Sequence, residues 1–293
     1  MTINLQDAYV GALVADAATM GLHWMYDQEQ IKKISATGDV LFRQPDATVY
    51  EGQKAYFAHA AKKVGEQSQY GESLRLVHRL MLSEGSYSVA VHQQCFFQTF
   101  GPCGSYHGFA DRPTKALVAR MISDGDALPS ASGSDDDQLP ALCSIPALFS
   151  NGAQSDEVAA AVSVTATHEQ AITGAQVLFD CLTRLQSGAN LPDALEQSIL
   201  LADTELANLM AESMALTTYD PLGTAEHFGQ ACHMVQGLPL AWHLLLNADD
   251  FESVLRDNVR CGGDSCGRAM AVGSIAGLAF GGPEHLQAKV AYL

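Results

Sequence analysis

The segment 261–268 carries the strongest chemical signal in this sequence. It reads Cys-Gly-Gly-Asp-Ser-Cys-Gly-Arg and precedes an apolar, helix-like stretch. Gly262 and Gly263 allow backbone angles and close approaches that other residues resist. Asp264 or Ser265 can cap the following helix, and a carboxylate beside free backbone N–H groups can also bind a hard cation or a phosphate. The motif therefore predicts either a simple helix start or a ligand site.

Two further acidic segments could contribute to such a site. Glu72 and Ser73 lie in the first turn of a predicted helix, where an acid complements the helix dipole. Asp135, Asp136 and Asp137 are consecutive, and such carboxylates are usually solvated or neutralised by a cation. Taken singly, each segment favours a structural role.

Single polar residues at or inside predicted helices need partners. His168 lies at a helix start, with Thr167 as the expected N-cap and Gln170 completing a capping box. Asp16 is a lone acid on an apolar helix and is expected to bind a helix terminus or a neighbouring loop. Arg268 opposes the dipole of its helix and is expected to pair with a carboxylate or an anionic ligand.

Histidines give weaker signals. His227 and His233, with Cys232 between them, do not have the spacing of a zinc site. The segment 23–27, His-Trp-Met-Tyr-Asp, is expected to belong to the core rather than to a ligand platform.

The elements that must position these residues are helices. Apolar residues recur three and four positions apart, as at Leu74, Val77, Leu80 and Met81, and strand alternation is scarce. The predicted loops are residues 35–52, 100–113 and 130–138. The predicted helices cover residues 4–22, 70–84, 86–99, 113–123, 138–149, 168–187, 191–202, 224–247, 249–258 and 265–281.

Composition limits the class of protein. The 293 residues are 47% hydrophobic, which allows a sizeable core in one domain covering 1–293. The 33 acidic residues outnumber the 16 basic ones, giving a net charge of -17 that argues against a nucleic-acid partner. No stretch has the length of a membrane span, and the seven cysteines lack regular spacing. We expect reduced thiols, no secretory signal, no membrane partner and a cytoplasmic location.

The order of several segments resembles the ADP-ribosylglycohydrolase family. The stretches GALVADAATMGLHW, THEQAITGAQVLF and NVRCGGDSCGRAMAVGSIAGLAFGG are similar to its opening, central and C-terminal helices, over about residues 4–282. HWMYD, QYGES, SDDDQLPAL and ACHMVQGLPLAWHLLL are more similar to a divergent branch that includes jellyfish J-type crystallins and selenoprotein J. The resemblance implies an all-α, orthogonal multi-helix bundle.

The resemblance also implies a metal-dependent hydrolase. Typical members bind two magnesium or manganese ions and cleave N- or O-glycosidic bonds of ADP-ribose. Here the first ligand run reads Tyr-Gly-Glu-Ser, with one acid instead of two, and Cys266 replaces an acid in the second. We therefore expect one Mg²⁺ or Mn²⁺ ion rather than two, held by Glu72, Ser73 and Asp264.

The leading hypothesis is a hydrolase acting on a small-molecule or ADP-ribosylated substrate, with Glu72 and Asp264 as catalytic residues. It requires the helix starts near Glu72 and Asp264 to face each other. The alternatives are a non-catalytic, crystallin-like binding or structural protein and, third, a thiol-dependent activity of Cys266. The expected substrate-binding residues are Asp135, Asp136, His168, Gly262, Gly263 and Ser265.

Overall fold

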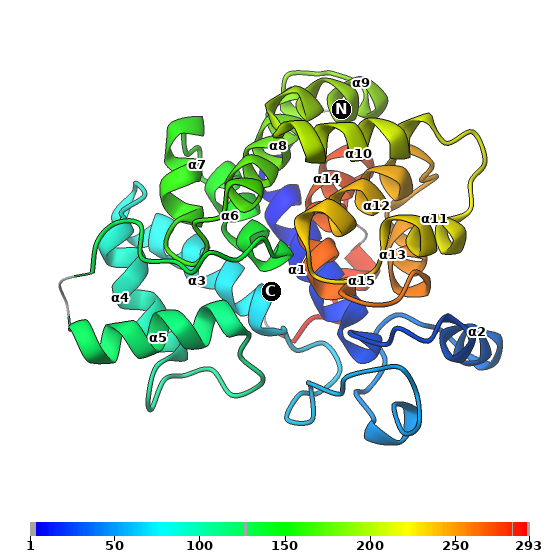
Figure 1. Cartoon of the computed structure of the whole chain (residues 1–293), viewed down its shortest axis with the longest axis horizontal. Coiled ribbons are helices and arrows are strands. Elements are labelled where there is room, and N and C mark those ends of the chain that lie inside the picture. Colours follow the sequence, from blue (N-terminus) through cyan, green and yellow to red (C-terminus); the bar gives the residue numbers. More distant parts are fainter. Residues whose placement is uncertain (1–3, 126–127, 283, 292–293) are drawn as a thin grey trace.

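Two apolar helices pack against each other at the centre of the fold. The computed structural model describes residues 4–125, 128–282 and 284–291. Helices α1 (Gln6–Thr19) and α14 (Ser265–Phe280) lie side by side, and almost every residue of both is buried (Figure 1). This all-round burial explains why the stretch after residue 265 is apolar on every face.

The central pair is close because small residues line it. A Cβ atom added to Gly11 would lie 2.2 Å from the carbonyl oxygen of Gly273, and one added to Gly273 would lie 2.5 Å from Ala15. The two backbones therefore touch where a larger side chain would separate them. The remaining helices surround this pair.

The other helices divide into two groups (Figure 1). One group, from α3 to α7, lies on one side of the central pair, and α10 to α13 lie on the other, with α8 and α9 between them. Within the described ranges no strand forms, and only isolated β-bridges occur. The bounds of these helices are α2 (Gln28–Thr37), α3 (Gln69–Glu84), α4 (Val89–Phe100), α5 (Arg112–Asp124), α6 (Ile145–Ser150), α7 (Ser155–Val162), α8 (Glu169–Gln186), α9 (Leu191–Ser198), α10 (Thr204–Ala215), α11 (Pro221–Phe228), α12 (Met234–Leu246), α13 (Phe251–Arg260) and α15 (Glu284–Gln287), with short 3-10 turns η1 (Met20–Leu22), η2 (Ala47–Val49), η3 (Leu139–Ser144) and η4 (Ile199–Leu201).

The all-α prediction is confirmed, but several elements differ from it. Helices α2, α7, α10 and the short α15 lie outside the predicted set. Helix α2 has only Ile31 and Ile34 buried, too few to give a clear period. Helix α10 does bury Leu206 and Met210, four residues apart, so its sequence contains the helical pattern.

Two predicted helices are interrupted. The predicted helix 224–247 is divided into α11 and α12, because Gly229 takes a φ of 97° that ends the first of them. The predicted helix 138–149 begins as the 3-10 turn η3 before α6. Across the part of the chain that the structure describes, no helix is both long and apolar enough to cross a membrane.

The contact of α1 with α14 generates a stability prediction. We expect Gly11→Ala to lower the free energy of unfolding by about 1–3 kcal/mol, because overpacking outweighs the gain in helix propensity of at most about 1 kcal/mol. Chemical denaturation measures this change.

The matched control is Gly38→Ala. Gly38 has an extended φ of 176°, and an added Cβ would lie no closer than 3.7 Å to another residue. We expect a change within about 0.5 kcal/mol. Equal effects of the two substitutions would show that the close contact does not control stability.

Candidate active site

One buried carboxylate joins the end of α1 to the start of α3. Asp16 is fully buried and accepts hydrogen bonds from the Ser68 backbone N–H at 2.7 Å and from the Ser68 hydroxyl at 2.5 Å. The same hydroxyl accepts from the backbone N–H of Tyr70 and so caps α3. Burial raises the pKa of Asp16 to about 6, although the Ser68 hydrogen bonds oppose this. The prediction that Asp16 binds a helix terminus is confirmed.

The two glycines before α14 shape the turn that begins the helix. Gly262 and Gly263 have φ angles of 75° and 65°, the left-handed region that favours glycine. The backbone N–H of Gly263 donates to the carbonyl of Met25 at 2.8 Å. Asp264 then caps α14, since its Oδ1 accepts from the backbone N–H of Gly267 at 2.8 Å. The helix-start interpretation of this motif is confirmed.

Arg268 stabilises the same turn from inside. Its guanidinium is fully buried and donates to the side-chain and backbone oxygens of Asn258 and, at 2.6 Å, to the carbonyl of Gly262. The expected carboxylate partner is not found among the described residues: uncharged oxygens in and just after α13 accept these bonds, and Nη1 of Arg268 has no partner there. Arg268 therefore has a structural role.

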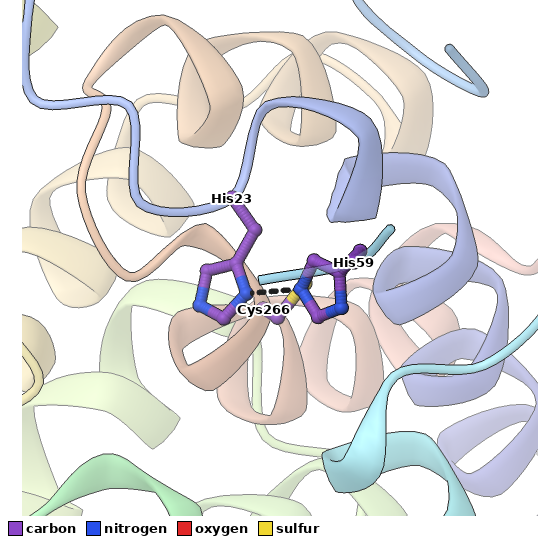
Figure 2. Close-up of side chains that lie close together, drawn as sticks. All are labelled: His23, His59 and Cys266. Atoms are coloured by element: carbon purple, nitrogen blue, oxygen red, sulfur yellow. Dashed lines mark hydrogen bonds between the residues drawn. The ribbon is translucent and has the colours of Figure 1, made fainter. Parts of the chain in front are cut away.

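A chain of polar side chains lies between these two helix starts. His23 follows α1, and its Nε2 lies 2.8 Å from Oδ1 of Asp264. Its Nδ1 lies 2.7 Å from Nε2 of His59, and the Cys266 thiol lies beside the two rings (Figure 2). One ligand atom from each of His23, His59 and Cys266 lies within 4.8 Å of the other two. We call His23, His59, Asp264 and Cys266 the buried cluster.

Protonation within the buried cluster follows from the hydrogen bonds. An ionised carboxylate can only accept, so His23 donates from Nε2, and a neutral His23 then accepts from His59 at Nδ1. Burial, together with His23 and Lys62, lowers the pKa of His59 well below its usual value. Burial likewise raises the pKa of the Cys266 thiol well above its usual value, which opposes a thiolate nucleophile.

Two atoms of the buried cluster have no hydrogen-bond partner among the described residues. They are Oδ2 of Asp264 and Nδ1 of His59, and both are inaccessible to solvent. A buried polar atom without a partner costs about 1–3 kcal/mol. Such atoms in a folded protein call for a functional explanation.

The head of α3 borders the buried cluster. The ring of Tyr70 meets the ring of His23 edge-on, with centroids 5.7 Å apart. His23 therefore contacts residues at the starts of both α3 and α14.

Glu72 itself is not part of that hydrogen-bonded chain. Its carboxylate pairs with Arg75 at 3.0 Å, and no hydrogen bond to the buried cluster is found among the described residues. Ser73 lines a cavity of about 30 Å³ together with Gln69 and Asp136, a space for one or two waters. Glu72 and Ser73 therefore have interaction partners different from those of Asp264.

The acidic run lies beside the start of α8. Asp135 is exposed, Asp136 is buried and pairs with Arg112, and Asp137 bonds to His233 at 2.8 Å. The run is therefore partly neutralised by protein side chains. The Ser265 hydroxyl is buried and, within the described part of the chain, bonds only to the carbonyl of Thr19, at 3.5 Å.

The predicted capping box at α8 is wrong. His168 is the N-cap, and its Nδ1 accepts from the backbone N–H of Gln170 at 3.2 Å. Thr167 donates instead to the carbonyl of Ser134, which joins the acidic run to the start of α8. Because Nδ1 of the His168 imidazole accepts the capping hydrogen bond, the N-cap of α8 is His168 rather than Thr167.

The side chains near Asp264 fit a magnesium ion poorly. Magnesium prefers near-octahedral oxygen donors, whereas the neighbours here are imidazoles and a thiol. The first acid of the family's run is Gly71 in this chain, and a Cβ there would lie 2.4 Å from Oδ2 of Asp16. A second carboxylate has no room at that position.

A larger cleft lies on the other side of the glycine turn. Its volume is about 740 Å³, and its lining includes Tyr26, Lys54 and Gln230. The carbonyl of Gln230 accepts from the backbone N–H of Asp264 at 2.9 Å, so the cleft adjoins the buried cluster. Pockets of this volume accommodate small-molecule ligands.

Two residues of the buried cluster, His23 and His59, were not predicted as site residues from the sequence. His23 was expected only in the core, where it indeed lies, and His59 carries no motif. The resemblance over HWMYD was the one available signal for His23. All seven cysteines are free, as expected for reduced thiols.

Comparisons with known proteins agree with the fold. The family model for ADP-ribosylglycohydrolase matches residues 4–292. Crystallin J1A of Tripedalia cystophora is 22% identical over 94% of this chain and 87% of its own length, and Crystallin J1B of the same organism is 20% identical over the same shares. A solved structure described as an ADP-ribosylglycohydrolase-related protein complex aligns with a TM-score of 0.67 and 13% identity, covering 99% of this chain and 96% of that one.

The Asp16–Ser68 contact predicts that loss of the N-cap of α3 destabilises the protein more than loss of an ordinary helix cap. We expect Ser68→Ala to lower the free energy of unfolding by about 2–4 kcal/mol, because it removes both a helix cap and a hydrogen bond to a buried carboxylate. Urea unfolding followed by circular dichroism measures the loss.

Ser88→Ala is the matched control. Ser88 also caps a helix, α4, but among the residues that the structure describes its hydroxyl accepts only from the backbone N–H of Val91. We expect a loss of about 1 kcal/mol. If the two serines cost the same, the Asp16 contact does not anchor α3.

Proposed function

Because the chain belongs to the ADP-ribosylglycohydrolase family, we propose that it hydrolyses an N- or O-glycosidic bond to ADP-ribose or a similar ligand. One observation carries the proposal: the hydrogen-bonded chain from Asp264 through His23 to His59 is buried where the heads of α3 and α14 meet. Unpaired buried polar atoms are costly, and active sites retain them for chemistry.

Asp264 and His23 form the proposed catalytic pair. A carboxylate that accepts from one imidazole nitrogen fixes the tautomer and leaves the other nitrogen as a base. Nδ1 of His23 takes the proton from the attacking water once the hydrogen bond from His59 to that nitrogen opens. Glu72 is the proposed second carboxylate, and it must leave Arg75 in order to act.

The cleft beside Gln230 is the proposed entry for the ligand. Gly263 lies against Gln230 of its lining. Gly262 is the proposed neighbour of the ligand on that side, whereas Asp135, Asp136 and His168 would reach the ligand from the side of the acidic run. A Mg²⁺ or Mn²⁺ ion at Glu72, Ser73 and Asp264 would polarise ribose hydroxyls. Because its donors fit poorly, no step of the proposal passes through it.

Asp264→Asn tests the proposal. We expect release of ADP-ribose from peptides carrying N-linked or O-linked ADP-ribose to fall by about 10²–10⁴-fold, because His23 loses its carboxylate. The unfolding free energy should change by less than about 1 kcal/mol, since asparagine caps a helix as well as aspartate does. Chromatographic detection of free ADP-ribose gives the rate.

Asp180→Asn provides the control, because Asp180 pairs with Arg184 on the surface of α8. It should retain the wild-type rate. A wild-type rate in Asp264→Asn would contradict the assignment of Asp264, and no release by the wild-type protein would contradict the hydrolase proposal.

A non-catalytic, crystallin-like role is the second candidate. It is favoured by the crystallin relatives and by the closure of the buried cluster, in which His23 and His59 are only 1% and 3% exposed. It predicts no turnover and no change in melting temperature when ADP-ribose is added. The hydrolase proposal predicts turnover and a rise in melting temperature.

A further inference from the structure

We propose that His23, His59 and Cys266 bind one divalent transition-metal ion, with zinc as the best fit. Each residue comes from a different part of the chain: the end of α1, the irregular segment before α3, and the first turn of α14 (Figure 2). The proposal goes beyond the proposed function and concerns a different state of the protein, because Nδ1 of His23 cannot bind an ion and act as a base at the same time.

The three donors are already gathered. Their ligand atoms lie within 4.8 Å of one another, and all three side chains are buried. A tetrahedral zinc ion with bonds of about 2.0–2.3 Å places neighbouring ligand atoms roughly 3.3–3.6 Å apart. The 2.7 Å contact between Nδ1 of His23 and Nε2 of His59 must therefore open by several tenths of an ångström.

Asp264 supplies the outer support that metal-binding imidazoles need. Its Oδ1 accepts from Nε2 of His23 at 2.8 Å, which leaves Nδ1 of that ring directed at His59. A carboxylate behind a ligating histidine fixes the ring and increases its basicity. Asp264 is thus a positioning residue in this site, and a fourth coordination position stays available for water or a ligand.

The donor types select the metal. Imidazole and thiolate are preferred by zinc and other late first-row ions, whereas magnesium and calcium prefer oxygen. On binding, the Cys266 thiol loses its proton to solvent and the sulfur becomes a thiolate ligand. Its neighbours Thr19 Oγ1, at 3.6 Å, and the Asp16 carbonyl, at 3.9 Å, keep the sulfur at the wall of the site.

The experiment uses the full chain, stripped with a chelator and reloaded with Zn²⁺ or Co²⁺. We expect about one equivalent of metal per chain by elemental analysis, and for cobalt a thiolate-to-metal charge-transfer band with tetrahedral d–d bands. X-ray absorption of the zinc form should show one sulfur at about 2.3 Å and nitrogens at about 2.0 Å. Less than about a tenth of an equivalent, or no sulfur ligand, would overturn the proposal.

Variants locate the ion. Cys266→Ser should remove the charge-transfer band, and His59→Gln should weaken binding at least about tenfold, as loss of a ligand does. Cys103→Ser, at an exposed thiol, and His92→Gln, at a buried histidine bonded to Tyr87, should bind like the wild type. An unchanged charge-transfer band in Cys266→Ser would show that the metal binds elsewhere. If that variant does not fold, the X-ray absorption spectrum of the wild-type zinc form shows whether sulfur is a ligand.

Metal content and spectra are recorded without substrate. ADP-ribose release is measured on the metal-free protein, so a protein that binds zinc but releases no ADP-ribose in the metal-free state would support the metal site and contradict the hydrolase proposal. A protein that releases ADP-ribose but binds no zinc would contradict the metal site and support the hydrolase proposal.

Discussion

The direct contact between the backbones of α1 and α14 is the constraint on which the rest of the structure depends. Without side chains at Gly11 and Gly273, the helices approach closely enough for the last turn of α1 to lie beside the first turn of α14. Thr19 and Cys266 consequently touch, although they are 247 positions apart. Larger side chains at Gly11 and Gly273 would separate the last turn of α1 from the first turn of α14, and the buried cluster would lose one of its walls.

Electrostatics also oppose a second acid at this junction. Asp16 occupies the space in front of Gly71, where its carboxylate holds the N-terminus of α3. A second acid there would face a buried negative charge at close range, which is strongly unfavourable in a low-dielectric interior. Nitrogen and sulfur donors near Asp264 avoid that repulsion, since both are neutral before they bind a cation.

The sequence predicts features that depend on local chemistry. Asp264 as a helix cap, the strained glycines before it and the anchoring role of Asp16 all follow from neighbouring residue types. The meeting of His23 with His59 does not, because a segment without regular structure joins them and no periodicity fixes its path. The position of the Glu72 helix was predictable, but its carboxylate is drawn to Arg75, a competition that spacing alone does not resolve.

The short segment 24–26 connects the turn before α14 to the irregular segment before α3. Four backbone hydrogen bonds join it to Gly263 on one edge and to residues 54–56 on the other. His23, His59 and Asp264 each lie within three residues of these bonded segments. Local unfolding of this segment would break all four hydrogen bonds and expose the buried cluster, so the closure of the cluster depends on the local stability of residues 24–26.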